Sequence, residues 1–188
     1  MKILQIITKG EIGGAQRIVL EIARGLKQAG DEVTVAFGEG TWLNEELGKS
    51  AIPTIHFASL KRSFNPFQNI FFIAELYLHL RKNQYDALHF HSSNTLFGSY
   101  AALATSTKTV CTLHGLSLLD PGYETSILIK WAYRQIFRLL LMPIDVIVAI
   151  TQSNAQYLEA HAIAHPTLIP NAIDPSQNIM RSREEAIS

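Results

Sequence analysis

The 188-residue sequence has a single cysteine, Cys111, and no long uninterrupted apolar run. One cysteine excludes an internal disulfide framework and favours a reducing compartment, so we expect Cys111 to fill space in a core. No window reaches the ~18 consecutive apolar residues that a transmembrane helix needs. The apolar run over residues 2–8 is too short for a signal peptide and is interrupted by Gln5, so it predicts a strand. These features predict a cytoplasmic protein.

The sequence also lacks an excess of charge of either sign, because sixteen Lys and Arg residues balance sixteen Asp and Glu residues. A general nucleic-acid-binding protein usually shows a strong basic excess, so we expect no nucleic-acid partner. Apolar residues make up 47% of the chain, enough for a substantial core. The length suits one domain of ordinary size, since a domain takes about 100–200 residues.

The familiar phosphate-binding motifs are absent, since the sequence contains neither G-x-G-x-x-G nor the full P-loop motif G-x-x-x-x-G-K-[ST]. This argues against an NAD-binding fingerprint and against a P-loop. The stretch "IITKGEIGGAQRIVLEIARGL" (6–26) nevertheless joins an apolar run to an amphipathic helix through Gly13 and Gly14. Two interpretations stay open: an anion binds at the helix N-terminus, or the turn needs glycine for its geometry alone.

Short apolar runs alternate with longer helical patterns along the chain. The predicted strands are 2–8, 32–38, 53–58, 86–92, 108–115, 145–151 and 166–171. The predicted helices are 14–29, 41–50, 66–83, 94–105, 124–142 and 153–161. This alternation predicts an α/β fold, a doubly wound, mostly parallel sheet with helices on both faces. Ligands bind such sheets at the carboxyl ends of the strands, where 10–17, 89–94 and 114–120 fall.

Three histidines lie in or after these predicted strands. His89 and His91 are two residues apart and so share one face of a strand. A metal would need a third ligand that the spacing does not supply, so we expect no metal. We expect the two histidines either to lie on the rim of a cleft or to form hydrogen bonds within the core. His114 ends a strand, where it could act as a general base, bond a substrate hydroxyl or serve structure alone.

The predicted helix "ILIKWAYRQIFRLLLM" (127–142) carries Lys130, Arg134 and Arg138 at four-residue steps among apolar residues. One hypothesis is that this cationic stripe lies on an anionic membrane surface. The other, slightly favoured, is a buried helix with one solvated face. The stretch 60–72 adds two more cations among aromatic residues.

With these residues assembled, the chain resembles the N-terminal domain of retaining, nucleotide-sugar-dependent glycosyltransferases with the GT-B fold, of the group 1 or family 4-like type. The resemblance is carried by "GGAQRIVLEIARGLKQAGDEVTV" (13–35), "YDALHFHSS" (85–93), "VCTLHG" (110–115), "VIVAITQSNAQYLEAHAI" (146–163) and "LIPNAID" (168–174). In that family two α/β domains face each other across a cleft. The first mainly binds the acceptor and the second holds the nucleotide-sugar donor.

The resemblance implies roles for individual residues. Gly13 and Gly14 would face the diphosphate or sugar of a nucleotide-diphosphate-sugar donor, and His114 would line the site near the transferred hexose. The residues expected around the acceptor and the cleft are Arg17, His91, Ser92, Thr151, Ser153 and Asn171. A glycan or a lipid-linked molecule would be the acceptor. The donor would be a co-substrate, and no cofactor is expected.

The resemblance also divides the chain into a domain over residues 1–174 and a linker or tail over 175–188. The family's donor-binding domain, with its pair of glutamates that have seven residues between them, has no counterpart in the sequence. We therefore expect little or no sugar transfer by this chain alone. The active site would be completed either within a longer enzyme or by a separate donor-domain chain. The alternative is a non-catalytic module that binds a glycan or a partner. Membrane contact would be at the inner face.

Overall fold

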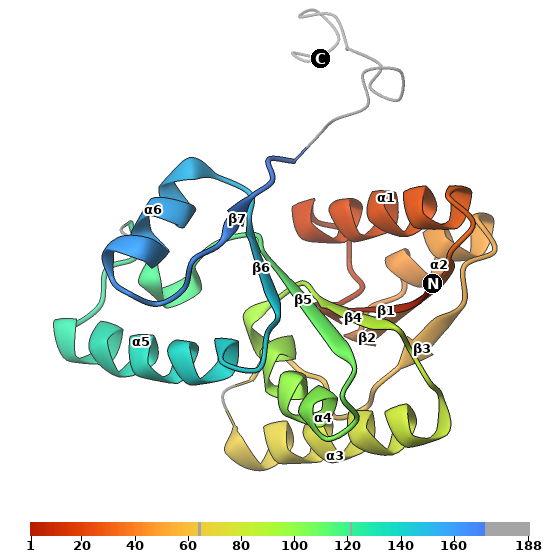
Figure 1. Ribbon diagram of the computed structural model, residues 1–188, viewed down its shortest axis with the longest axis horizontal. Coiled ribbons are helices and arrows are strands. Elements are labelled where there is room, and N and C mark those ends of the chain that lie inside the picture. The colour runs from red at the N-terminus through yellow and green to blue at the C-terminus, as the bar shows by residue number, and fades with distance from the viewer. Residues whose placement is uncertain (64, 121, 172–188) are drawn as a thin grey trace, which may run out of the picture.

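The computed structural model describes residues 1–63, 65–120 and 122–171. Its strands all run parallel in one sheet of order β3-β2-β1-β4-β5-β6-β7 (Figure 1). The strands are β1 (Lys2–Lys9), β2 (Glu32–Glu39), β3 (Thr54–His56), β4 (Ala87–Phe90), β5 (Lys108–Leu113), β6 (Val146–Ala149) and β7 (Thr167–Leu168). The order of the strands reverses between β1 and β4. This topological switch point is where open α/β sheets bind their ligands.

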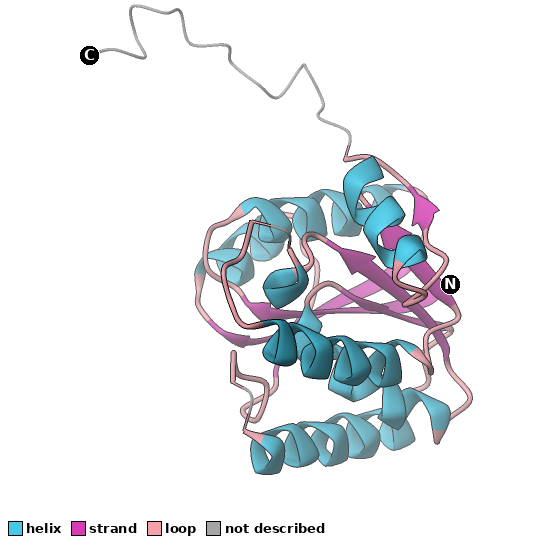
Figure 2. Ribbon diagram, turned by 90° about the vertical axis from the view of Figure 1, so that its left-hand side faces the viewer, coloured by secondary structure: helices cyan, strands magenta, loops and turns pink. Residues whose placement is uncertain are grey.

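Helices cover the two faces of the sheet unequally (Figures 1 and 2). One face carries α1 (Gly14–Gln28) and α2 (Trp42–Lys49), and the other carries α3 (Pro66–Lys82), α4 (Ser99–Leu103) and α5 (Ile127–Leu141). The helix α6 (Gln152–Ala160) lies beside β6 and β7. Two 3-10 helices, η1 (Ser93–Gly98) and η2 (Ser117–Leu119), follow β4 and β5.

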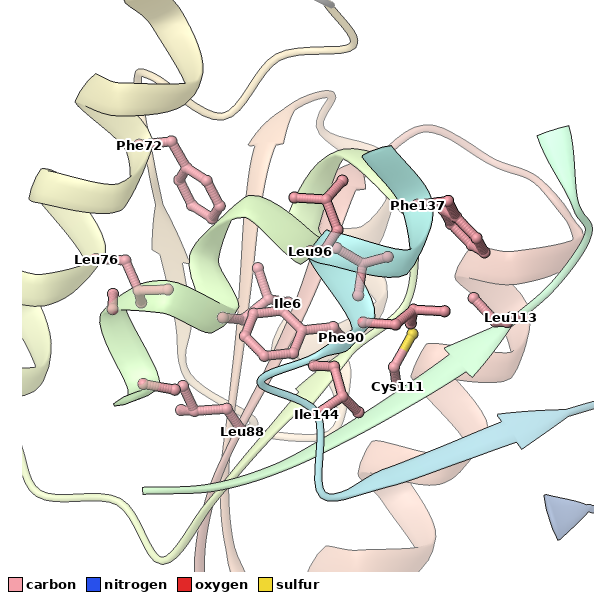
Figure 3. Close-up of a cluster of buried hydrophobic side chains, with 14 of the residues drawn as sticks. Ile6, Phe72, Leu76, Leu88, Phe90, Leu96, Cys111, Leu113, Phe137 and Ile144 are labelled. Carbon is pink, nitrogen blue, oxygen red and sulfur yellow. The ribbon is translucent and has the colours of Figure 1, made fainter. Parts of the chain in front are cut away.

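Both faces of β1 are mainly apolar because both faces of the sheet are covered. In β1, Leu4 and Ile6 belong to the larger core cluster, while Ile7 packs with α1 and α2 in the smaller one. Figure 3 shows the larger cluster, in which Phe72 and Leu76 from α3 approach Ile6 and Phe90. Cys111 lies in the same cluster with no exposed surface, which confirms its predicted place in the core.

The structure confirms the predicted fold class and corrects one predicted helix. Residues 94–105 form η1 followed by the five-residue α4, and a continuous helix there was wrong. This segment is rich in Ser, Thr and Ala, and Ser99 directs its hydroxyl to the carbonyls of Leu96 and Leu140. Such side-chain bonds to backbone compete with a regular helix. The predicted boundary at residue 174 lies outside the described residues.

Candidate functional site

A pocket of about 190 Å³ opens at the switch point, where β1 and β4 end. Its walls come from the end of β1, the first turn of α1, the residues after β4, the loop that contains Arg62, and the start of η2 at Ser117. The lining residues are Ile7, Thr8, Lys9, Ala15, Gln16, Arg62, His91, Ser92, Ser93, Asn94 and Ser117. Hydroxyl, amide and cationic groups dominate this set, and no carboxylate is in it. The pocket therefore suits a ligand that is both polar and anionic.

The turn between β1 and α1 does not need Gly13 or Gly14 for backbone geometry. Gly13 has φ −179°, an extended conformation that any residue adopts, and Gly14 is the first residue of α1. A Cβ on Gly14 would meet no atom within 4 Å. A Cβ on Gly13 would meet mainly the flexible end of Gln16, at 2.6 Å. The packing inside the chain leaves the space beside Gly14 free for an incoming group.

The N-terminus of α1 is also electrostatically uncompensated. Gly13 supplies no side-chain cap, and the first turn has no acidic residue. In three other helices the N-cap side chain accepts a hydrogen bond from an amide of the first turn. These N-caps are Asn65 before α3, Ser126 before α5 and Thr151 before α6. Since the first N–H groups of a helix seek an acceptor, the start of α1 offers its donors and its dipole to an anion.

The three predicted histidines form a row across β4 and β5. His89 Nε2 lies 2.8 Å from Thr112 Oγ1, and the rings of His89 and His91 are 3.9 Å apart. His91 Nδ1 lies 3.3 Å from His114 Nε2. His91 is 1% exposed, so it lies beneath the rim on which one prediction placed it. The hydrogen bond to His91 occupies Nε2 of His114 and leaves its Nδ1 for a further partner.

Burial keeps this row neutral. Burial lowers the pKa of His89 to about 4, and the nearby His114 lowers it further. Burial also lowers the pKa of His91 well below the ordinary value, and His89 and His114 add to that shift. Burial likewise lowers the pKa of His114. Neutral imidazoles can each donate one hydrogen bond and accept another, so His114 suits a substrate hydroxyl better than it suits an anion.

Hydrogen bonds between loops fix the outer wall of the pocket. Thr8 Oγ1 lies 2.5 Å from Ser92 Oγ, which ties β1 to the segment after β4. Asn94 Nδ2 donates to the carbonyl of Ser63 at 2.9 Å and so holds the loop that carries Arg62. Ser93 and Ser117 meet at 3.1 Å between their hydroxyl oxygens. Of the residues that line the pocket, only His91 and Ser92 were predicted as site residues from the sequence.

The other predicted site residues are not in the pocket lining: Gly13 and Gly14 adjoin it through Ala15, and His114 adjoins it through His91. Arg17 is exposed on α1, and its side chain has no ionic partner within the described ranges. Thr151 caps α6 by accepting a hydrogen bond from the Asn154 amide at 3.2 Å, and Ser153 lies 3.2 Å from its hydroxyl. Asn171 is exposed at the end of the described chain. Thr151 and Ser153 follow the carboxyl end of β6, and Asn171 follows that of β7, further along the same edge of the sheet.

The predicted cationic face of α5 needs correction. Lys130, Arg134 and Arg138 are all half-buried, whereas Leu128, with 72% of its surface exposed, lies on the outward face. Lys130 donates to the carbonyl of Asp120, and Arg138 donates to the carbonyls of His161 and Ala162. The outward face of this helix is therefore apolar, and the cations flank it.

Within residues 1–63, 65–120 and 122–171, no group of three or more His, Cys, Asp or Glu side chains is placed to hold a metal. The same ranges contain no helix that is long and apolar enough to cross a membrane.

The sheet order, the helices on both faces and the pocket at the switch point define one Rossmann-like half of a GT-B architecture. The chain belongs to Glycosyltransferase Family 4, whose family model matches residues 12–177. No curated protein matches the sequence.

Solved structures share the fold over almost the whole chain. HepE from Anabaena, solved with UDP and glucose, matches with TM-score 0.71 and 19% identity over 93% of this chain and 45% of its own. A glycosyltransferase from Rickettsia africae matches with TM-score 0.70 and 22% identity over 95% and 46%. Sucrose-phosphate synthase from Thermosynechococcus elongatus matches with TM-score 0.67 and 14% identity over 90% and 48%. The chain thus spans less than half the length of these proteins.

Proposed function

We propose that this chain is the acceptor-side half of a retaining glycosyltransferase. It would serve the transfer of a hexose from a nucleotide-diphosphate sugar to a glycan or a lipid-linked acceptor. The observation that carries the proposal is the uncapped start of α1, whose Ala15 and Gln16 line the pocket at the switch point. This geometry suits a diphosphate, because helix N-terminal amides bind anions. HepE, which has the same fold, was solved with UDP and glucose.

In this proposal His114 orients a sugar hydroxyl. Its free Nδ1 can donate to or accept from a hydroxyl, while His91 fixes the other nitrogen at 3.3 Å. Ser92, Ser93 and Asn94 add hydroxyl and amide groups on the pocket wall, which suits a polyhydroxylated acceptor. The proposal requires no metal.

The donor half is expected to supply what this half lacks. Departure of a nucleoside diphosphate develops negative charge that preorganised cations and dipoles must stabilise. The pocket offers Lys9, which already pairs with Glu11 and Glu39, and Arg62, which is exposed. We therefore propose that the 188-residue chain turns over little or no nucleotide sugar without a donor-binding half, joined to it or supplied as a separate chain.

Amide chemical shifts test the diphosphate site directly. UDP or inorganic pyrophosphate added at millimolar concentration to the ¹⁵N-labelled chain should shift the amides of Gly14, Ala15 and Gln16. Uridine, which lacks phosphate, is the matched ligand control and should leave them in place. Unchanged shifts at these three amides with pyrophosphate would contradict the proposed anion site.

Release of nucleoside diphosphate tests the catalytic part. The chain alone should release none from UDP-glucose above the buffer blank, and clear turnover by it would overturn the proposed dependence on a second half. The alternative function, a non-catalytic module for a glycan or a partner, predicts stable glycan binding with no donor-domain protein co-purifying from source cells. Co-purification of such a protein, with turnover by the complex, supports the transferase.

A further inference from the structure

The helices on one side of the sheet leave a wide apolar surface uncovered. We define the apolar helical face by six residues on the outward sides of α3 and α5: Phe67, Phe71, Leu78, Leu128, Trp131 and Leu139. Between 54% and 72% of the surface of each is exposed. Figure 1 shows α3, α4 and α5 on the same side of the sheet, opposite α1 and α2.

The two outward stripes belong to one surface because α4 joins their helices. Residues of α4 pack against α3, and the Tyr100 hydroxyl donates to the carbonyl of Leu139 at 2.9 Å. Leu103, also on α4, is 59% exposed between them. Contiguous apolar surface of this kind marks an interaction site on a folded protein.

The charges carried by the helices of this face are mainly positive. The helix α5 contains three cations and no carboxylate, and α3 ends in the exposed pair Arg81 and Lys82. Lys130 and Arg138 bond backbone carbonyls, which leaves their charge uncancelled. The single acid of α3, Glu75, accepts hydrogen bonds from Ala58 and Ser59. An apolar stripe with Lys and Arg along its margin is the pattern of helices that lie on anionic membranes.

Other occupants fit this face less well. A donor-binding half would meet the carboxyl edge of the sheet, where the pocket lies. Leu78 and Leu139, however, sit in the last turns of α3 and α5, which lead back to the opposite edge, where β4 and β6 begin. A second copy of the chain would bring its own cations against these, and like charges repel.

We propose that the apolar helical face docks this protein on the surface of an anionic lipid bilayer. The six apolar side chains would enter the interface between headgroups and acyl chains, and Lys130, Arg81 and Lys82 would contact anionic headgroups. This inference does not rest on the proposed transfer reaction, and the experiments below measure no turnover.

Sedimentation with vesicles tests the docking. The chain should sediment with phosphatidylcholine vesicles that contain phosphatidylglycerol, and less with phosphatidylcholine alone or at high salt. The double variant Lys82→Gln/Lys130→Gln should lower partitioning about tenfold or more, since each cation near a surface contributes about 1 kcal/mol. The control Lys27→Gln/Lys49→Gln removes the same charge from the α1–α2 side and should partition like the parent chain.

The apolar contribution has its own matched pair. Leu128→Ser should weaken binding severalfold, while Ile12→Ser, at a residue 61% exposed in the β1–α1 turn, should not. Thermal melts of all variants check that the fold is intact. Equal losses in both members of either pair would overturn the proposed face, as would no sedimentation at low salt.

The two tryptophans give an independent readout. Trp131 lies on the apolar helical face, and Trp42 lies in α2 on the other side of the sheet. Brominated phospholipids quench a tryptophan that enters the bilayer. Trp42→Phe, which keeps Trp131, should be quenched, and Trp131→Phe, which keeps Trp42, should not. The reverse result, or a stable dimer in solution whose formation Leu128→Ser abolishes without any vesicle binding, would overturn the proposal.

Discussion

The contact between His91 and His114 sets what His114 can offer a ligand. Because both rings are neutral and joined through His91 Nδ1 and His114 Nε2, one nitrogen donates and the other accepts. A fixed hydrogen bond on one side of an imidazole fixes its tautomer on the other side. His91 is thus a positioning residue for His114.

This role predicts a spectroscopic change. Long-range ¹H–¹⁵N spectra of the parent chain should show His114 in a single tautomer. His91→Leu should produce a mixture of tautomers, whereas His91→Asn, whose amide can reach the position of Nδ1, should restore one. A single tautomer in His91→Leu would show that another group sets it.

Gln5 is the polar residue that interrupts the apolar run of β1. Its side chain is fully buried beside His89 in the sheet register, and neither amide atom has a hydrogen-bond partner among the described residues. A buried unsatisfied polar group costs about 1–3 kcal/mol. Gln5→Met, of similar length, should therefore raise the free energy of unfolding by about that amount, measured by urea denaturation. A loss of stability would mean that the amide is satisfied in solution.

Single site residues could be predicted only where the residue type itself carries chemistry. His91, His114 and the glycine pair stand out in the sequence because few other roles explain them at strand ends. Arg62 and Ser117 do not, because Arg62 reaches the pocket from a loop and Ser117 from the start of η2, and the positions of both segments depend on distant contacts. The bond from Asn94 to the carbonyl of Ser63, for example, joins residues 31 positions apart.

At the scale of elements, the start of α1 offers a test that separates function from stability. Gly14→Ala should leave the fold intact, since its Cβ would meet no atom within 4 Å. The new methyl group should instead obstruct a ligand and weaken the pyrophosphate-induced shifts about tenfold or more, an effect on the order of 1.4 kcal/mol.

Gly25→Ala is the matched control in the same helix. Gly25 is exposed in α1, also with nothing within 4 Å of its Cβ position. This change should raise the free energy of unfolding by about 0.5–1 kcal/mol through helix propensity and leave pyrophosphate binding unchanged. Equal effects of the two substitutions on binding would remove the case for a ligand at Gly14.

Elements with a strong apolar period could be predicted from sequence, and their outward faces could not. The pattern of α5 shows where the helix lies, but nearly every position is apolar or cationic, so the buried side depends on what surrounds it. Tyr133 and Phe137 pack inward, while Leu128 and Trp131 remain outside. The three cations suggested a solvated face, and in the structure they flank an apolar one.

At the scale of the whole molecule, strand order creates the site. The β1–β4 reversal brings Thr8 against Ser92, residues 84 positions apart. Alternating strands and helices predict the class of fold and the edge at which ligands bind, because crossovers are right-handed and connections short. The strand order itself depends on where in the sheet the chain places β4 after α3. No local sequence pattern specifies that position.

The buried histidines make the stability of the whole fold depend on pH. The folded state holds His89 and His91 with lowered pKa values, while the unfolded chain takes up protons near the ordinary value of 6.5. The unfolded state therefore binds more protons as the pH falls below 6.5, and stability is lost in that direction. For His89 this loss continues until about pH 4, where the folded state is also protonated.

The prediction is a fall in the free energy of unfolding between pH 6.5 and 4.5, approaching about 1.4 kcal/mol per pH unit for each such histidine. The carboxyls with lowered pKa, Glu46 and Asp145, titrate in the unfolded chain at about 4.5 and below, so this window reports mainly on histidine. His79, half-buried on α3, has its pKa lowered by burial and adds to the slope.

Urea denaturation of His89→Asn across this window should give a shallower slope than the parent chain. His165→Asn, at an exposed residue, should keep the parent slope. Identical slopes for all three proteins would mean that His89 is protonated within the fold.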